Sequence, residues 1–188
     1  MVRGAEMNES ERYIETVTVD EIPWHRLTTP YGRATQFPRY FTALETMDDA
    51  AAVEDALYEL TMNTEHQGTL WHATPFAMIF LARIFRRACT AQPANEIAQV
   101  IVRRLLEHFL LMDECVHMGD EMEHAEPLPR FSDLLREEYL WSEIYDEEAD
   151  ELRYEDDEVF PADLFYSFYY YSAQVLASCG DACAKKML

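Results

Sequence analysis

Glycine and lysine are both scarce in this sequence. The 188 residues include only five glycines, and the only lysines are Lys185 and Lys186. Because glycine is rare and apolar residues recur at helical spacing along most of the chain, we expect a nearly all-α fold. The shortage of cations argues against direct nucleic-acid binding, whose affinity comes from basic side chains that displace counterions at phosphates.

Long apolar runs and a secretory signal are also missing. No apolar stretch reaches the roughly 20 residues that a membrane span needs. The first residues lack the basic end and apolar core of a signal peptide. The four cysteines are scattered among apolar residues, which favours buried thiols, with a redox pair of Cys179 and Cys183 as the alternative. We therefore expect a cytoplasmic protein that has no contact with membranes.

The usual catalytic motifs are absent as well. The sequence has no glycine-rich phosphate loop, nucleophile elbow, Cys-x-x-Cys pair or His-Glu-x-x-His pair. Glu-x-x-His occurs at Glu114–His117 and at Glu121–His124, but both copies lie on one segment and cannot face each other across a bundle. We interpret them as chance spacing, and we expect no catalytic residue, no cofactor and no bound metal.

Helical periodicity is strongest in the middle of the chain. The apolar stretch 75–82 predicts a core helix over 75–90, with Thr74 as its N-cap and Pro75 in its first turn. Asn95 is the predicted N-cap of a second strong helix, over 96–117. The remaining predicted helices, one of them capped by Asp48 or Asp49 and another by Ser132, span 21–27, 38–46, 50–65, 133–158 and 162–182.

These helices are expected to form one domain. Consecutive antiparallel helices joined by short loops indicate stacked helical hairpins, with a closed helical bundle as the alternative. We expect residues 1–18 to be a weakly ordered N-terminal segment with a short extended piece at 13–19, and residues 19–188 to be the domain.

The first third of the chain resembles a known group of proteins. The resemblance rests on a tryptophan, a Tyr-Gly-x-Ala turn, a proline before a short helix, and an HQGT loop followed by Ala-Thr and an apolar helix. In this chain the matching residues are Trp24, Leu27, Tyr31-Gly32-Arg33-Ala34, Pro38, Leu44, Ala56-Leu57, Leu60, Asn63, His66-Gln67-Gly68-Thr69 and Ala73-Thr74. This pattern is similar to that of bacterial HEAT-like repeat proteins, among them immunity-type proteins found beside polymorphic toxins. The resemblance implies a HEAT-like fold and a cognate toxin as partner.

The HQGT loop is interpreted mainly as a scaffold. Gly68 can adopt the left-handed geometry that ends a helix, and His66, Gln67 and Thr69 can bond the carbonyls left open there. A loop that contacts a partner is the second interpretation, and catalysis by His66 is the third.

Negative charge is concentrated near the C-terminus. The chain has 36 acidic and 15 basic residues, a net charge of −21, but residues 113–163 alone carry 20 acids and three arginines. Between Asp146 and Glu158, nine of thirteen residues are acidic and only Arg153 opposes them. Like charges at three- and four-residue spacing destabilise a helix. A run of acidic residues as dense as this one therefore indicates either a surface with a function or a face that is simply solvated.

We interpret the acidic tract as a surface that meets a cationic protein, with a plain solvated face and metal storage as alternatives. Dense acid speeds the capture of a basic protein and rejects acidic ones. The aromatic stretch 165–171 is interpreted mainly as core packing with tyrosine hydroxyls at its edge. As the alternative, Tyr166 and Tyr170, four residues apart, are exposed anchors for a protein partner, and they are included on that basis. The predicted partner-binding residues are Asp146, Glu147, Glu148, Asp150, Glu151, Glu155, Asp156, Asp157, Glu158, Tyr166 and Tyr170.

The sequence thus predicts a binding protein and not an enzyme: an immunity protein that occludes the active site of a basic toxin. One alternative is a HEAT-like DNA glycosylase, which would need at least five arginines clustered along a groove. Another is an acidic mimic of nucleic acid, which differs from the first prediction only in the identity of its partner.

Overall fold

Helix α4, which spans Thr74–Ala91, lies at the centre of the fold. Every residue from Thr74 to Ala82 is buried, as expected for a helix with neighbours on all sides. The computed structural model describes residues 7–122, 125–146, 148–149 and 160–187, with side chains described up to Cys179 in the last helix. The helices that pack against α4 are α2 (Phe37–Thr46), α3 (Ala50–Thr64), α5 (Glu96–Val116) and α7 (Ala162–Met187).

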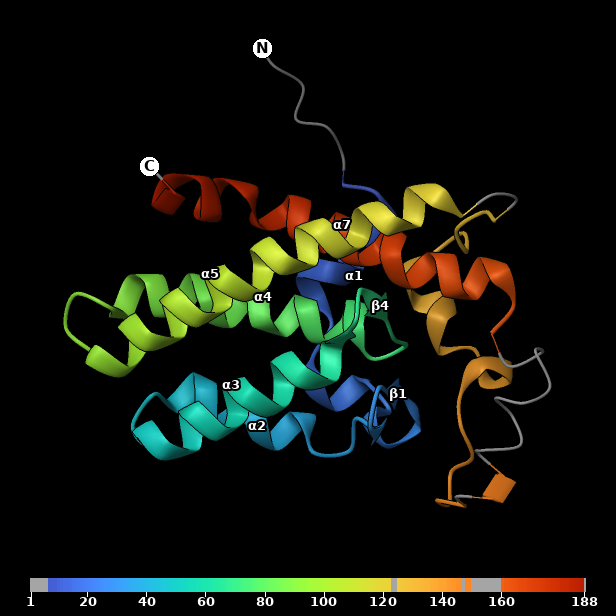
Figure 1. The fold of residues 1–188 in the computed structure, drawn as a ribbon, viewed down its shortest axis with the longest axis horizontal. Coiled ribbons are helices and arrows are strands. Elements are labelled where there is room, and N and C mark those ends of the chain that lie inside the picture. The colour runs from blue at the N-terminus through green and yellow to red at the C-terminus, as the bar shows by residue number, and fades with distance from the viewer. Residues whose placement is uncertain (1–6, 123–124, 147, 150–159, 188) are drawn as a thin grey trace, which may run out of the picture.

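These five helices form three layers. Helices α2 and α3 make one helical hairpin, and α4 and α5 make a second. The hairpins stack so that α2 lies against α4 and α3 against α5, while α7 packs on both helices of the second hairpin. Figure 1 shows the first hairpin at the bottom, the second in the middle and α7 at the top. The predicted all-α class is confirmed, and the arrangement is one of stacked hairpins.

A short β-hairpin leads into each helical hairpin. In the second β-hairpin the turn residues Gln67 and Gly68 have φ angles of 52° and 83°, the left-handed geometry of a two-residue hairpin turn. Gly68 therefore has a positive φ, as predicted, but it closes a β-hairpin and does not end α3, which stops at Thr64. The antiparallel pairs are β1 (Thr28–Thr29) with β2 (Gly32–Arg33), and β3 (Glu65–His66) with β4 (Thr69–Leu70).

The helices α2 to α5 agree with their predicted bounds to within one residue at each end. Asp49 caps α3 and Asn95 caps α5, each accepting two backbone N–H groups. The prediction for Thr74 is wrong, because it is the first helical residue and Ala73 is the N-cap. The Thr74 hydroxyl instead accepts a hydrogen bond from the Trp71 N–H and donates one to the Thr64 carbonyl, which joins the two ends of the β-hairpin.

The N-terminal part differs from the prediction. Helix α1, Glu9–Thr16, lies within the segment 1–18 that is predicted to be weakly ordered, and it overlaps the predicted extended piece at 13–19. Arg83 of α4 donates to the carbonyl oxygens of Ile14 and Val17, both at 2.6 Å, and so ties α1 to the core helix. The predicted helix over 21–27 is replaced by two 3-10 turns, η1 (Val19–Glu21) and η2 (Trp24–Arg26).

The predicted helix over 133–158 is wrong in its described part. The chain forms two 3-10 helices, η4 (Phe131–Leu135) and η5 (Glu137–Tyr139), and is irregular over 140–146. Asp133 is buried inside η4, where it binds Arg130 at 2.8 Å and Arg136 at 3.4 Å. These bonds lower the pKa of the Asp133 carboxyl, chiefly through the hydrogen bond from Arg130. Among the described helices, none is both long and apolar enough to cross a membrane.

Candidate functional site

Residues 137–146 form a segment that two arginines attach to the N-terminal part of the fold; we call it the 137–146 segment. The Arg26 guanidinium makes a paired hydrogen bond to the Glu137 carboxylate, at 2.5 and 2.9 Å, and its Nε donates to the Trp141 carbonyl at 2.6 Å. In return, the Trp141 N–H donates to the Arg26 carbonyl at 3.0 Å. The hydrogen bond to Glu137 raises the pKa of Arg26, so the ion pair stays charged.

Arg33 makes the second attachment. Its Nη1 donates to the carbonyls of His25 and Ser142, both at 2.7 Å. The guanidinium carbon also lies 5.2 Å from the ring centres of Trp141 and Tyr145, in cation–π contact with both. The segment is therefore held by a set of bonds that span more than a hundred residues of sequence.

Two large apolar side chains of the 137–146 segment point into solvent. Ile144 is 82% exposed and Tyr145 is 61% exposed, although the predicted helix would place both on an apolar inward side. Tyr31, in the turn between β1 and β2, is 60% exposed. It shares a shallow hollow with Tyr145, Arg33 and other residues. Exposed aromatic rings next to a fixed backbone are typical of protein-binding surfaces.

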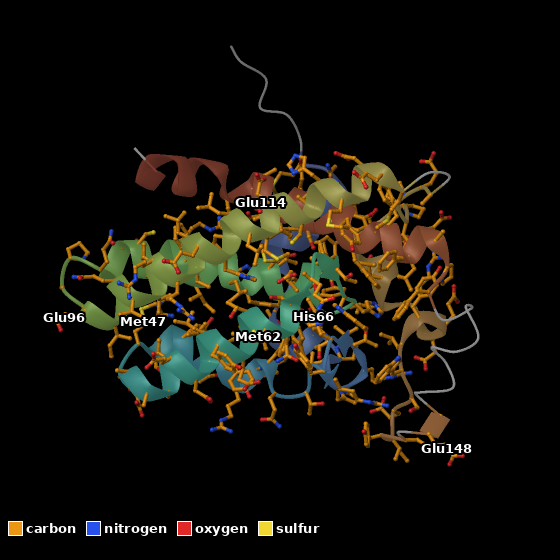
Figure 2. All side chains as sticks on the ribbon, in the orientation of Figure 1. Met47, Met62, His66, Glu96, Glu114 and Glu148 are labelled. Carbon is orange, nitrogen blue, oxygen red and sulfur yellow. The ribbon has the colours of Figure 1, made fainter. Side chains whose placement is uncertain are left out.

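Carboxylates surround these side chains. Glu143 lies 2.9 Å from His25 Nε2 and 3.6 Å from Arg26, while Asp146 and Glu148 are exposed. Figure 2 places Glu148 at the edge of the molecule, away from the stacked helices. The other predicted partner-binding carboxylates lie outside the described residues: Glu147, Asp150, Glu151, Glu155, Asp156, Asp157 and Glu158.

The two predicted tyrosine anchors belong to a different region. Tyr166 and Tyr170 lie on α7 with their ring centres 6.1 Å apart. Tyr166 is half-buried near Gly119, and Tyr170 faces a hollow beside Asn8 and Pro127. In Figure 1 α7 lies at the top of the molecule, whereas residues 140–146 lie at the lower right beside β1. Tyr166 and Tyr170 therefore lie on a different element from Asp146 and Glu148, and the role of these residues in binding a partner stays a prediction.

The residues of the HQGT loop make contacts within and between the two β-hairpins. The Gly68 N–H donates to the Glu65 carboxylate at 2.6 Å, and His66 Nδ1 lies 3.1 Å from the Tyr31 hydroxyl. The second contact joins the two β-hairpins, and the rings of Tyr31 and His66 meet edge to face with their centres 5.6 Å apart. The loop thereby positions Tyr31 beside the 137–146 segment.

Two further histidines and two of the cysteines are buried in the described core. His72 and His108 are buried, and desolvation lowers the pKa of each to about 4. Cys115 and Cys179 are buried, and burial raises the pKa of Cys115 to about 11. No group of three or more potential metal ligands occurs among the described residues. In the first Glu-x-x-His pair, His117 hydrogen bonds to the Asp113 carbonyl.

The sequence pattern points to only part of this surface. Tyr31 and Arg33 belong to the Tyr-Gly-x-Ala turn of the resemblance, but nothing local connects that turn with Trp141 and Tyr145. Arg26 and Arg33 are the sequence signal that could have indicated this attachment, since arginines bind carbonyls and carboxylates. Comparison of the chain with known protein families, curated proteins and solved structures finds no match.

Proposed function

We propose that the chain is a cytoplasmic immunity protein that binds a basic toxin and blocks its active site. One observation carries the proposal: the 137–146 segment presents Ile144 and Tyr145 to solvent among carboxylates, and two arginines hold it in place. A fixed segment loses little conformational entropy on binding, so its contacts translate into affinity. Aromatic side chains add contact area that is rigid and largely apolar.

Charge supports a basic partner. The carboxylates of Glu143, Asp146 and Glu148 continue into the acidic tract of the sequence, where acids outnumber bases by 20 to three over residues 113–163. Such a field speeds encounter with a cationic protein and suppresses acidic competitors. A toxin that acts on nucleic acid needs a cationic cleft for phosphates, and an acidic segment is complementary to such a cleft.

The arginines give less support to a glycosylase. A groove for DNA needs cations that are available to phosphates. In the described structure Arg26, Arg33, Arg83 and Arg130 donate to protein carbonyls or carboxylates. An acidic mimic of nucleic acid would use the same surface as an immunity protein, so the nature of the partner separates those two functions.

Growth rescue tests the proposal. The gene next to this one is expressed in a sensitive host, with or without the chain, and growth is measured. We expect the wild-type chain to restore growth. The variant Asp146→Asn/Glu148→Gln/Tyr145→Ala should lose protection, because it removes two exposed charges and the exposed ring but keeps the hydrogen bonds of Arg26 and Arg33 to the segment.

The matched control changes the same kinds of residue elsewhere. Glu45→Gln/Asp48→Asn/Tyr58→Ala also removes two exposed carboxylates and one exposed tyrosine ring, all outside the 137–146 segment. It should protect as well as the wild type. Equal protection by both triple variants would exclude the 137–146 segment as the binding site.

A further inference from the structure

We propose that the face formed by α3 and α5 binds a basic amphipathic helix of another protein. Eleven large hydrophobic residues are exposed in the described structure, and six of them lie on α3, α5 or η3 (His117–Glu121). Four of these are Tyr58 and Met62 on α3, Leu111 on α5 and Met118 in η3; we call them the α3–α5 strip. The proposal concerns a different face from the 137–146 segment and does not depend on a toxin-neutralising function.

A buried hydrogen bond fixes how the two helices meet. Thr64 Oγ1 of α3 lies 3.1 Å from His108 Nε2 of α5. Leu111 follows His108 by three residues, so it lies on the side of α5 that faces α3. Leu110 is rotated by about 100° from Leu111 and points away from α3. The contact thus assigns Leu111, but not Leu110, to the strip.

The two ends of the strip are placed by other contacts. Tyr58 and Met62 are four residues apart on α3 and so lie one above the other. Met118 in η3 reaches the turn of the second β-hairpin, where its sulfur would lie 2.7 Å from a Cβ placed on Gly68. Figure 2 shows Met62 and His66 near the middle of the face turned to the viewer and Glu114 above them on α5. The strip therefore runs from α3 across to the end of α5.

The residues around the strip are mainly acidic. Helix α3 has three acidic residues and no basic one. Helix α5 and η3 together have six acidic residues and two arginines, Arg103 and Arg104. Exposed carboxylates close to the strip include Glu54, Glu107 and Glu114. A ligand that covers the apolar side chains is therefore met by negative charge on its flanks.

This combination selects the kind of ligand. A helix that is apolar on one face and basic on its borders would pack on the strip and pair its lysines or arginines with the surrounding carboxylates. Methionine suits such a contact because its flexible thioether adapts to different side chains. A second copy of this chain fits poorly, since each copy carries a net charge of −21 and the acidic borders would face each other.

The test uses the full chain and a synthetic probe. The probe is a peptide of about 18 leucines and lysines arranged with an apolar face at helical spacing, and the reference peptide has the same composition in scrambled order. Titration calorimetry in moderate salt gives the dissociation constants. We expect the amphipathic peptide to bind at least about tenfold more tightly than the scrambled one, because only it presents a continuous apolar face.

A matched pair of variants locates the site. Leu110 and Leu111 are neighbours with 46% and 43% exposure, so each can be replaced by serine at similar cost to folding. Leu111→Ser should weaken binding of the amphipathic peptide about tenfold, in keeping with the loss of one buried leucine, and Leu110→Ser should change it less than about twofold. Circular dichroism and thermal unfolding check that both variants fold.

Three results would overturn the proposal. The first is equal binding of the two peptides, which would reduce the interaction to charge alone. The second is an equal effect, or no effect, of the two leucine variants. The third is a wild-type chain that sediments as a dimer and becomes a monomer on Leu111→Ser, because the strip would then be covered by a second copy.

Discussion

At the scale of single residues, two buried histidines carry the clearest physical consequence. His72 donates from Nε2 to the Leu134 carbonyl at 2.7 Å and stacks on Phe168, with ring centres 5.2 Å apart. His108 meets Thr64 between α3 and α5. Both are kept neutral because burial lowers the pKa of each to about 4.

The fold should therefore lose stability as the pH falls through the range between 6.5 and 4. In the unfolded chain a histidine titrates near its ordinary pKa of about 6.5, so the unfolded state binds more protons in this range. The contribution of each histidine is complete above pH 6.5. The contribution of each histidine to the free energy of unfolding should fall by roughly 2 kcal/mol between pH 6.5 and pH 5. Urea unfolding at a series of pH values measures it.

Comparison of variants isolates this effect from the titration of the many carboxylates. His72→Gln and His108→Gln keep an amide that can bond to Leu134 or Thr64 but cannot be protonated in this range. Each should flatten the pH dependence of the unfolding free energy. His117→Gln is the control, because His117 is exposed and its bond to the Asp113 carbonyl raises its pKa. If all three variants show the wild-type slope, the buried histidines are not the cause.

At the scale of structural elements, the attachment of the 137–146 segment by Arg26 and Arg33 is the central feature. Arg26→Met keeps much of the side-chain volume but removes the paired bond to Glu137 and the bond to the Trp141 carbonyl. We expect faster amide hydrogen exchange over 137–146 and little change in α4 or α5. Mass spectrometry of proteolytic fragments resolves the two regions.

Arg39→Met is the matched control, since Arg39 is an exposed arginine on α2, away from the segment. It should leave exchange over 137–146 unchanged. Unchanged exchange in Arg26→Met as well would show that the segment is held mainly by the apolar contacts of Leu140 and Trp141, both of which are buried.

The same elements show which parts of the fold can be read from the sequence. Helices α3 and α5 are capped by Asp49 and Asn95, and α4 is marked by its apolar run, so capping and periodicity suffice to predict them. Helix α1 also has a local signal that the prediction overlooked, the capping box of Asn8 and Glu11.

The 137–146 segment could not be read in this way. Its apolar residues and carboxylates suggest a helix locally, but Arg26 and Arg33 bind its backbone and side chains from more than a hundred residues away. Those bonds satisfy carbonyls that a helix would otherwise use. The exposure of Ile144 and Tyr145 follows from this tertiary contact, so periodicity placed them on the wrong side.

At the scale of the whole molecule, two stacked helical hairpins and α7 form a frame that holds surfaces of different character. The 137–146 segment and Tyr31 lie at the end of the frame where the β-hairpins are, and the α3–α5 strip lies along one face. Both are bordered by carboxylates, in a chain with a net charge of −21. Both surfaces are therefore expected to bind a partner, or a part of a partner, that carries positive charge.

The dependence of affinity on salt tests this expectation most directly. The protein encoded by the neighbouring gene is titrated with the wild-type chain by calorimetry, at salt concentrations from about 50 mM to about 500 mM, a range over which exposed charges become screened. We expect the dissociation constant to rise at least about tenfold over this range, and to rise less for Asp146→Asn/Glu148→Gln. Tight binding with a dissociation constant that does not change with salt would contradict electrostatic recognition of a basic partner.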